Sequence, residues 1–328
     1  MATIEIFQYR ALAPGPRLLI LGAVHGNETC GATAIRAIAA EFGSGERRLA
    51  RGMLTLVPVA NPVAFARGAR DGDRNLNRDF RPSVVPQDAE DRIANQLAPL
   101  LADHDALVDL HSFAAPGEPF VFLGPTDNDG ELEPFRRAAE ETALALAVGP
   151  RRLVYGWLPA YARGVRRRAN GSVAYGIGTT EYMRHRGGYA VTVECGQHAD
   201  PAAPSVARRA IEQALGLLAL CDPDPAAIGA ATTATTTAAP AATSLAAPPA
   251  AVEWVELADV FDRQAEGDRF ERSWRSFDRL SAGDPIARRG NGEVLRAPEA
   301  GYVVFPNPNA PVGREWFYFA RVGRRDLR

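Results

Sequence analysis

The amino-acid sequence predicts an α/β fold, with a mixed, mostly parallel sheet flanked by helices, plus a small C-terminal all-β domain. Three observations lead to this prediction. Apolar runs alternate with segments of helical period, a nearly uncharged Ala/Thr/Pro-rich stretch follows, and β-prone runs separated by Gly, Pro and Asn come last. Hydrophobic residues make up 46% of the sequence and charged residues 23%, which is typical of a globular protein with a substantial core.

Five runs have the length and the boundaries of buried strands. They are Arg17–Val24, Met53–Val59, Ala106–Leu110, Phe120–Leu123 and Tyr189–Val193. Each is apolar along most of its length instead of alternating with polar residues, a pattern typical of strands that are covered on both faces. We therefore expect these runs to be the central strands of the sheet.

Segments of helical period lie between or after these strands and are rich in residues that favour helix, such as Ala, Leu, Glu and Arg. They are Thr29–Phe42, Asp88–Leu101, Leu132–Ala147 and Pro204–Leu220. Because strands and helices alternate along the chain, we expect helices on both faces of one sheet.

The composition divides the chain into three parts. Residues 1–221 form the α/β domain, residues 222–251 an Ala/Thr/Pro-rich linker, and residues 252–328 the small β domain. The linker has too little apolar area to offset the entropy of ordering, so we expect it to be mobile or semi-extended. A β domain of this size folds alone only marginally, so we expect a barrel or sandwich that docks near the active site.

Composition also excludes several classes of protein. All 37 side chains in the Lys and Arg total are arginine, so the sequence contains no lysine. This absence excludes a Schiff-base lysine, a P-loop lysine and a lysine that carries biotin or lipoate. The formal net charge of -2 gives no bulk attraction to nucleic acid or to an anionic membrane, and we expect neither as a partner.

Cysteine usage and hydropathy bear on the compartment. Cys30, Cys195 and Cys221 form neither a disulfide framework nor a CxxC pair, which fits a reducing cytoplasm. The first residues lack the pattern of a cleavable signal, and no run is apolar enough to span a bilayer. We expect a cytoplasmic protein that acts on a small molecule, and the sequence leaves a homo-oligomer open.

Two segments place metal-ligand side chains at strand ends. LLILGAVHGNETCG puts His25 after a buried strand and Glu28 where the next helix is expected to begin, and ALVDLHSF puts His111 after another strand. If the strands run the same way, these side chains meet at one edge of the sheet. A set of two histidines and one carboxylate suits a catalytic zinc ion, although Mn, Co or Fe can also bind to it. Taken singly, each of these residues is equally consistent with a surface ion pair or a capping residue. Asp109 can orient His111 or lie in the core.

A further carboxylate ends the strand in YAVTVECGQH. A buried carboxylate is costly unless it is used, so Glu194 is a candidate to take a proton from water and deliver it to a leaving amine. The structural alternative is an ion pair with an arginine. Cys195 should point to the opposite face of the strand, so we expect it in the core and not as a nucleophile, and we expect His198 at the surface.

The segment NPVAFARGARDGDRNLNRDF is dense in Arg, Asp and Asn, as solvated loops are. Planar donors in such a loop can also hold a substrate carboxylate or polarise a scissile carbonyl. The candidates for these tasks are Arg70, Asn77 and Arg78.

The motifs HGNE, GARDGDRNLNRDF, DLHS and VECG, in this order, resemble the succinylglutamate desuccinylase/aspartoacylase family, a branch of the zinc carboxypeptidase-like hydrolases. The resemblance spans residues 17–200, and GYVVFPNPNAPVGREWFYFA is similar to the family's small β domain. It implies one zinc ion per chain, bound by His25, Glu28 and His111, and Glu194 as the catalytic carboxylate.

The resemblance also implies roles for the planar donors. Arg70 resembles the arginine that polarises the substrate carbonyl, and Asn77 and Arg78 resemble the pair that grips the substrate carboxylate. Arg184, which precedes Glu194 in EYMRHRGGYAVTVE, resembles a further carboxylate-binding arginine. The linker is longer than the family pattern implies.

From these residues and this resemblance we expect a zinc-dependent deacylase that hydrolyses the amide bond of an N-acyl amino acid or a related small carboxylate-bearing amide. Two alternatives stay open at this stage. A metallocarboxypeptidase acting on short peptides can use the same metal set and Asn-Arg pair, and a metal- and carboxylate-binding protein without catalysis can use the same ligands.

Overall fold

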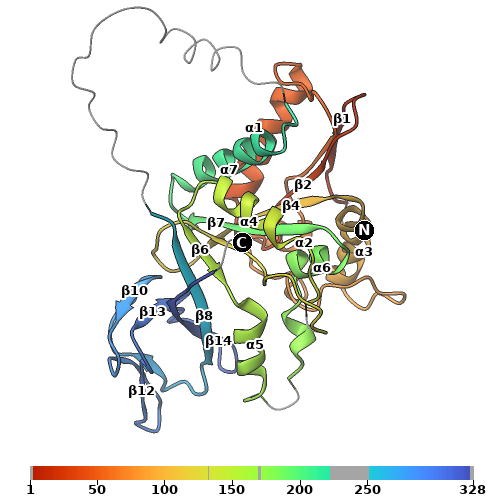
Figure 1. Ribbon diagram of the computed structural model, residues 1–328. Helices are drawn as coiled ribbons and strands as arrows, with labels where there is room; N and C mark the ends of the chain where they lie inside the picture. Colours follow the sequence, from red (N-terminus) through yellow and green to blue (C-terminus); the bar gives the residue numbers. More distant parts are fainter. Residues whose placement is uncertain (1–2, 132, 169–170, 222–250, 326–328) are drawn as a thin grey trace, which may run out of the picture.

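The computed structural model describes residues 3–131, 133–168, 171–221 and 251–325. The predicted linker 222–251 lies outside the described residues except for Ala251, and so does Leu132, the first residue of a predicted helix. Figure 1 shows a sheet with helices on its faces and the C-terminal strands gathered at one end.

One sheet of eleven strands runs through the described part of the chain, in the order β1-β3-β2-β4-β7-β5-β6-β8-β14-β13-β10. Its first seven strands along the sequence are β1 (Phe7–Arg10), β2 (Arg17–Gly22), β3 (Met53–Val57), β4 (Ala106–Phe113), β5 (Phe120–Phe122), β6 (Arg152–Tyr155) and β7 (Tyr189–Gln197). The pairs β2–β3, β2–β4, β4–β7 and β5–β6 are parallel, whereas β1 and β5 are antiparallel to β3 and β7. The predicted mixed, mostly parallel sheet is therefore confirmed.

All five predicted strands are present, as β2, β3, β4, β5 and β7. Two of them run further than predicted, β4 to Phe113 and β7 to Gln197. The extensions matter for the site, because they place His111 and Glu194 inside paired strands instead of in the loops that follow.

Helices cover both faces of the sheet. They are α1 (Cys30–Ser44), α2 (Pro62–Arg67), α3 (Ala89–Asp103), α4 (Ala138–Ala147), α5 (Trp157–Val165), α6 (Thr179–His185) and α7 (Ala203–Leu217), with a 3-10 helix, η1 (Val173–Gly176). Leu18 and Ile20 of β2 join the core under α1, α4 and α7, whereas Leu19 and Leu21 join the core under α3 and α6. Successive residues of β2 therefore serve two cores, which is why the strand is apolar throughout. No helix within the described ranges has both the length and the apolar character needed to cross a membrane.

The predicted helix 132–147 was wrong at its start. Phe135 forms an isolated bridge with Asn128, and α4 begins only at Ala138. The helix predicted to end at Leu220 ends at Leu217, because Ala219 has a φ of 48°, which leaves the helical region. The short elements α2, α5, α6 and β6 were not predicted.

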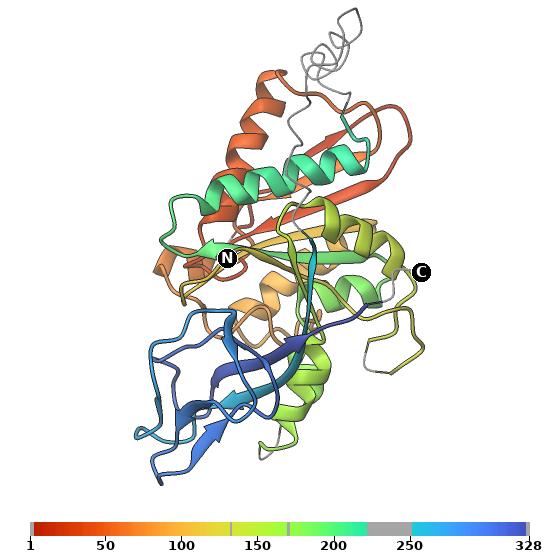
Figure 2. The ribbon, with the colours of Figure 1, turned by 60° about the vertical axis from the view of Figure 1, so that its left-hand side comes forward.

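The C-terminal strands confirm the all-β prediction for this part of the chain. They are β8 (Glu253–Asp262), β9 (Arg269–Phe270), β10 (Asp278–Leu280), β11 (Pro285–Arg288), β12 (Val294–Arg296), β13 (Gly301–Val304) and β14 (Glu315–Val322). β8 is parallel to β6 and antiparallel to β14, so these strands continue the main sheet (Figure 2). A second sheet, β12-β11-β9, packs on β13 and β14.

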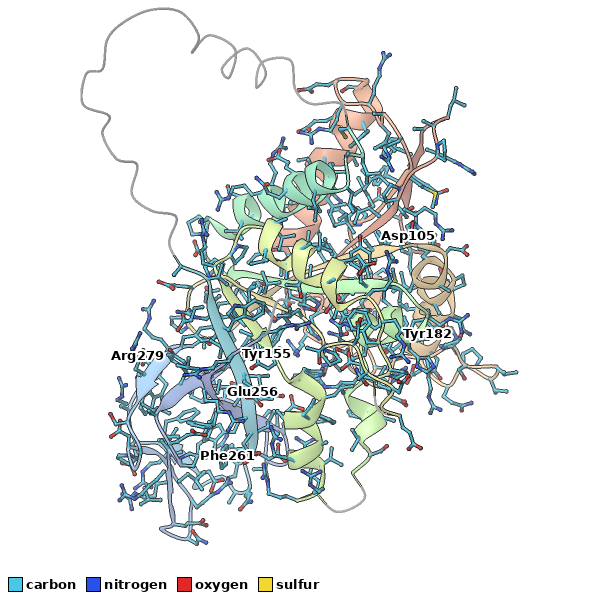
Figure 3. The ribbon with its side chains drawn as sticks, in the orientation of Figure 1. Asp105, Tyr155, Tyr182, Glu256, Phe261 and Arg279 are labelled. Carbon is cyan, nitrogen blue, oxygen red and sulfur yellow. The ribbon has the colours of Figure 1, made fainter. Side chains whose placement is uncertain are left out.

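Figure 3 places Glu256 and Phe261 on β8 and Arg279 on the outer strand β10. Whether residues 252–328 form a domain of their own stays a prediction. The continuous pairing from β6 to β8 to β14 fixes the first residue of β14, Glu315, at the edge of the main cavity.

A buried carboxylate ties three elements together beside this sheet. Glu141 of α4 is completely buried and accepts hydrogen bonds from the backbone N–H groups of Gly124 (2.5 Å) and Ala190 (2.8 Å). Its Oε2 also accepts from Nε of Arg184 on α6, at 2.8 Å. These three donors satisfy a charge that would otherwise be costly to bury.

Glu141→Ala should lower the free energy of unfolding by about 3–5 kcal/mol, because it leaves the Arg184 guanidinium and two backbone donors without this partner. Urea unfolding monitored by circular dichroism measures the difference. Glu140→Ala is the matched control, since the neighbouring Glu140 is about half exposed and, among the residues that the structure describes, forms its ion pair with Arg137. Equal effects of the two substitutions would contradict the role of Glu141.

Candidate active site

The candidate ligands meet at one edge of the sheet. His25 and Glu28 lie between β2 and α1, and His111 lies on β4, which pairs in parallel with β2. Glu194 on β7 stands directly opposite His111 in the register of β4 and β7. The convergence that the strand pattern predicted is therefore present in the structure.

The local geometry at Glu28 differs from the expected one. The helix begins at Cys30, so Glu28 precedes it and does not lie on its first turn. The backbone N–H of Glu28 donates to the carbonyl oxygen of His25 at 3.1 Å, closing a tight turn between them. This turn, and not a helix, brings the two side chains to the same side.

Glu28 lies between the two imidazoles. Its Oε1 is 2.8 Å from Nδ1 of His25, and its Oε2 is 2.9 Å from Nδ1 of His111. The backbone N–H of Ser112 donates to Oε2 at 3.0 Å, and Nη1 of Arg70 donates to Oε1 at 2.9 Å. Both carboxylate oxygens are therefore held in fixed positions.

An oxygen atom also lies close to the far nitrogen of each ring, as a hydrogen bond at His25 and as a close charged contact at His111. Nε2 of His25 lies 3.1 Å from Oδ1 of Asn75, and Nε2 of His111 lies 3.1 Å from Oδ1 of Asp109. The other oxygen of Asp109 accepts a hydrogen bond from Oγ1 of Thr179, at 2.5 Å. Such contacts are typical of metal-binding histidines, because they orient the ring, here with Nδ1 of both rings turned toward Glu28.

The orienting residues were only partly predicted. Asp109 was identified as one of two possibilities, whereas Asn75 and Thr179 were missed. Asn75 lies in the same Arg- and Asn-rich loop as the predicted donors, so that composition was a usable signal. Thr179 comes from α6, and nothing in its local sequence indicates the contact.

These three side chains can hold a divalent metal ion. His25, Glu28 and His111 are each at most 3% exposed, and one ligand atom from each lies within 4.8 Å of the others. Nδ1 of His25 has no hydrogen-bond partner although it is close to Glu28. A buried nitrogen that has no hydrogen-bond partner and faces a carboxylate and a second imidazole is what is expected at a cation-binding site.

Protonation also favours a cation. Burial and the nearby Arg70 lower the pKa of His25 to about 4, which leaves a neutral ligand at pH 7. Although burial opposes it, the two histidines hold the pKa of Glu28 well below its usual value, so this carboxylate is ionised. Burial alone would lower the pKa of His111, but the negative charges of Asp109 and Glu28 raise that pKa well above its usual value. A bound cation would compete with that proton for Nδ1 of His111.

The carboxyl of Glu194 is buried and has a raised pKa. It is 7% exposed, and its Oε2 is buried without a hydrogen-bond partner. Burial raises its pKa to about 8, with Glu28 adding to the effect and His111 and Arg70 opposing it. Cys195, the next residue, is fully buried in the core on the other face, as expected.

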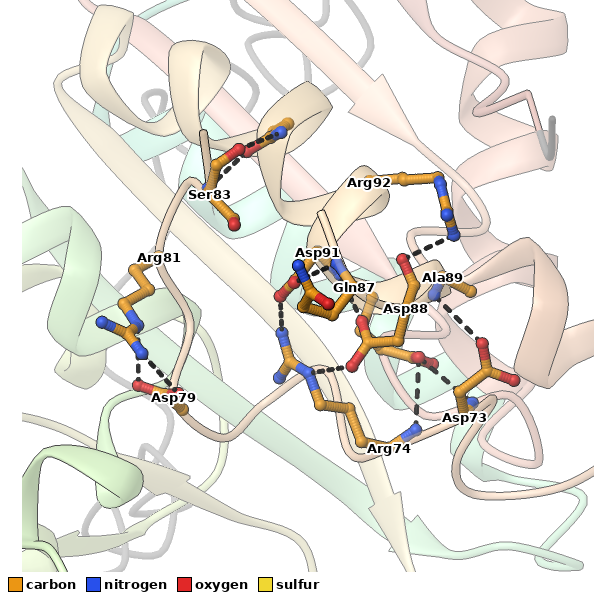
Figure 4. Close-up of polar contacts among 12 residues, drawn as sticks. Asp73, Arg74, Asp79, Arg81, Ser83, Gln87, Asp88, Ala89, Asp91 and Arg92 are labelled. Carbon is orange, nitrogen blue, oxygen red and sulfur yellow. Dashed lines mark hydrogen bonds and ion pairs between the residues drawn. The ribbon is translucent and has the colours of Figure 1, made fainter. Parts of the chain in front are cut away.

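The Arg-rich loop that carries Arg70 is anchored by carboxylates of α3. The buried Glu90 accepts hydrogen bonds from the backbone N–H groups of residues 72, 73 and 74, at 3.1 to 3.2 Å. Arg74 pairs with Asp88 and Asp91, at 2.9 and 2.8 Å (Figure 4). These contacts fix residues 72–74 of the loop, and Arg70 is held next to Glu28 by its own hydrogen bond.

Asn77 and Arg78 lie further along the same cavity. Oδ1 of Asn77 accepts a hydrogen bond from the backbone N–H of Thr179 at 2.9 Å. Nη2 of Arg78 donates to Glu315 of β14 at 3.1 Å, and its guanidinium lies 4.7 Å from the ring centre of Trp157. The C-terminal strands therefore contact one of the predicted substrate-binding residues directly.

Arg184 is 4% exposed and not adjacent to the metal candidates by any described contact. Its Nη1 pairs with Glu133 at 2.7 Å and Glu181 at 3.3 Å, and its Nε pairs with Glu141. Arg184 lines the same cavity as the metal candidates, but these contacts already occupy its donors. Its substrate-binding role stays a prediction.

One cavity of about 860 Å³ joins all these groups. Its lining includes the metal candidates, Glu194 and Arg70, together with aromatic and further charged side chains. His198, which was expected at the surface, also lines it and bonds through Nδ1 to Oγ of Ser112 at 2.8 Å. The space is large enough for a small organic substrate.

Asp109→Asn should weaken divalent metal binding about 10- to 100-fold, because the neutral amide holds the His111 ring less firmly and makes it a weaker ligand. Competition with a fluorescent zinc chelator measures the affinity. Asp105→Asn serves as the control, because Asp105 lies just before the same strand and pairs with the partly exposed Arg17. An unchanged affinity in the Asp109 variant would argue against this arrangement.

Comparison with known proteins adds to this geometry. Residues 14–133 match the model of the succinylglutamate desuccinylase/aspartoacylase catalytic domain. No curated protein matches the chain significantly.

Solved structures share the fold over nearly the whole chain. A succinylglutamate desuccinylase/aspartoacylase from Rhodobacter sphaeroides has a TM-score of 0.69 at 18% identity, covering 98% of this chain and 90% of that one. The product-bound ectoine utilization protein EutE (DoeB) from Ruegeria pomeroyi has a TM-score of 0.66 at 21% identity, covering 97% and 88%. A succinylglutamate desuccinylase from Vibrio cholerae has a TM-score of 0.65 at 17% identity, covering 94% and 82%.

At these identities the solved structures establish the fold alone. The matched residues 14–133 include His25, Glu28 and His111, together with the loop that carries Arg70. The order of the four motifs, the match over residues 14–133 and the shared fold agree, and this part of the chain is similar to the catalytic domain of the succinylglutamate desuccinylase/aspartoacylase family.

Proposed function

We propose that this protein is a zinc-dependent deacylase that hydrolyses the amide bond of an N-acyl amino acid or a related small carboxylate-bearing amide. The observation that carries the proposal is Glu194, whose buried and unpartnered Oε2 lies in the same cavity as His25, Glu28 and His111. The family match supports a hydrolase. The similar proteins named as succinylglutamate desuccinylases are consistent with an N-acyl amino acid as substrate.

His25, Glu28 and His111 would hold the zinc ion, one per chain. When bound, zinc supplies a Lewis acid that makes water a better nucleophile at neutral pH and stabilises negative charge on the substrate oxygen. The donor set of two imidazoles and one carboxylate is the one that catalytic zinc uses with a position left for water.

Glu194 moves the proton in the proposed reaction. Its Oε2 accepts a proton from the attacking water as the C–O bond forms, and delivers that proton to the nitrogen as the C–N bond breaks. The raised pKa of Glu194, about 8 in the absence of metal, makes its carboxylate a stronger base than an ordinary glutamate, and a bound cation would lower that pKa toward the range in which the group exchanges a proton at neutral pH. The products are a carboxylic acid and a free amine.

The planar donors position the substrate. Arg70 is about half exposed to the cavity and bonded to Glu28, so its remaining N–H groups can donate to the carbonyl oxygen as charge develops there. Asn77 and Arg78 hold the substrate carboxylate, and Arg184 is a further candidate for that task.

Glu194→Gln should lower kcat by at least about 100-fold, because the amide cannot accept the proton, while zinc binding stays intact. Amine release from succinyl and acetyl derivatives of acidic, basic and neutral amino acids measures the rate, and elemental analysis measures the zinc. Glu212→Gln, on the surface helix α7, is the control and should be fully active.

Near-native turnover in the Glu194 variant would refute its role. Release of amino acids from short peptides but not from N-acyl amino acids would instead favour a metallocarboxypeptidase. A zinc-loaded protein that binds small acids and releases no amine from any compound would favour a binding protein without catalysis.

A further inference from the structure

Arg184 of α6 lines the cavity of the candidate active site, but its guanidinium is almost fully occupied. Its Nε donates to Glu141 at 2.8 Å, and its Nη1 donates to Glu133 at 2.7 Å and to Glu181 at 3.3 Å. Its Nη2 donates to the backbone carbonyl oxygen of Ala190 at 2.9 Å. A guanidinium carries five N–H groups, so these contacts leave a single N–H for any other acceptor.

Packing prevents Arg184 from turning its guanidinium toward a ligand. The side chain is 4% exposed, and its Nε lies so close to the backbone of Gly124 that a Cβ there would collide with it. The guanidinium also lies over the ring of Phe135, 5.8 Å from the ring centre. A bidentate grip on a carboxylate needs two adjacent N–H groups, and Arg184 no longer has such a pair to offer.

Negative charge exceeds positive charge among Glu133, Glu141, Glu181 and Arg184, which we call the Arg184 cluster. Within the described ranges, the ion pairs of all three carboxylates are with Arg184. The neighbouring Arg325 interacts electrostatically with Glu141 but donates its hydrogen bonds to two backbone carbonyl oxygens. Burial raises the pKa of Glu133 to about 7, against the opposing effect of Arg184 and with the support of Glu181 and Glu141. The cluster therefore has no positive charge to spare for a ligand.

The Arg184 cluster lies next to Asn77, one of the two residues proposed to hold the substrate carboxylate. Oδ1 of Asn77 accepts a hydrogen bond from the backbone N–H of Thr179, at the start of α6. Glu181, two residues further along α6, accepts from the backbone N–H of Gly178 at 2.9 Å. Asn77 and Glu181 both line the cavity, so the side chain of an amino acid held at Asn77 comes within reach of Glu181.

A second carboxylate on the substrate is disfavoured beside Glu181. It would meet the negative charge of Glu181 without a free guanidinium to bind it, and like charges repel strongly in a cavity from which water is largely excluded. It would also lose its own hydration without gaining a charged partner. A side chain without negative charge avoids both costs.

We propose that the Arg184 cluster selects against a second carboxylate, so that the substrates are N-acyl amino acids whose side chains carry no negative charge. Glu181 is then a specificity-determining residue, and Arg184 balances the cluster instead of binding substrate. The proposal rests on the proposed function, because it takes the substrate to be an N-acyl amino acid held by its carboxylate. If Arg184 instead grips a substrate carboxylate, the preference is reversed.

N-acetylglutamine and N-acetylglutamate test the proposal in the full-length, zinc-loaded protein, because the two compounds differ in charge and hardly in shape. If the protein releases another acyl group faster, both compounds carry that group instead. The kcat/KM for the glutamine compound should be at least about tenfold higher than that for the glutamate compound. An equal or higher kcat/KM for the glutamate compound would overturn the proposal.

Glu181→Gln identifies the source of the preference, because it removes one negative charge at nearly constant shape. The ratio of the two kcat/KM values should fall about tenfold, whereas a purely structural effect would change both values by the same factor. Glu133→Gln should lower the ratio by a smaller factor, because this carboxyl is already partly protonated at pH 7. It also leaves the hydrogen bond between Gly178 and Glu181 in place, so it covers the case in which Glu181→Gln fails to fold.

Glu140→Gln is the matched control. It removes a carboxylate of α4 that is about half exposed and pairs with Arg137, and it should leave the ratio unchanged. A ratio that stays at the wild-type value in the folded variants of Glu181 and Glu133 would contradict the proposal.

If the wild-type protein releases no amine from any N-acyl compound, the proposed function fails, and calorimetry decides the inference separately. Binding of N-acetylglutamine that is at least about tenfold tighter than that of N-acetylglutamate supports it. Equal or tighter binding of N-acetylglutamate, or no binding of either compound at millimolar concentration, rejects it.

Discussion

The candidate site depends on one buried carboxylate, that of Glu28, held between two imidazoles. A charge with 1% exposure is stable only if other groups compensate it, and here His25, His111, Arg70 and the backbone of Ser112 all point to its two oxygens. The need to compensate buried polar groups also explains why an amide oxygen of Asn75 and a carboxylate oxygen of Asp109 lie beside the far nitrogens of the two rings. The partners of Glu28 come from three separate segments, the turn after β2, the strand β4 and the Arg-rich loop, so the site exists only when all three are in place.

The sheet does most of this positioning. Parallel pairing of β2, β4 and β7 sets His111 beside Glu194 in register and brings their strand ends to the turn that carries His25 and Glu28. Glu90 then holds the Arg-rich loop by its backbone, which leaves the side chain of Arg70 free to face Glu28. On the far side, the continuation of the sheet through β8 brings Glu315 and Tyr318 of β14 to the same cavity.

The central strands and the convergence of His25, Glu28, His111 and Glu194 could be predicted, because apolar runs mark buried strands and ligand crevices form at their carboxyl ends. Contacts that depend on tertiary structure could not. The side chains on α6 that meet Asp109 and Glu141 are about 70 and 40 positions away along the chain, and no local pattern links them. The continuation of the sheet into the C-terminal strands could not be predicted either, because the pairing of β6 with β8 leaves no pattern in the residues of either strand.

Zinc K-edge X-ray absorption of the zinc-loaded protein tests the central claim most directly. With His25, Glu28 and His111 as ligands, the spectrum should show nitrogen and oxygen neighbours at about 2.0–2.2 Å with the outer-shell scattering of two imidazoles. Cys30 and Cys195 are buried and lie near Glu28 and Glu194 in the sequence. A sulfur ligand at about 2.3 Å is therefore the clearest competing result. Sulfur in the first shell, or a spectrum without imidazole scattering, would contradict the assignment.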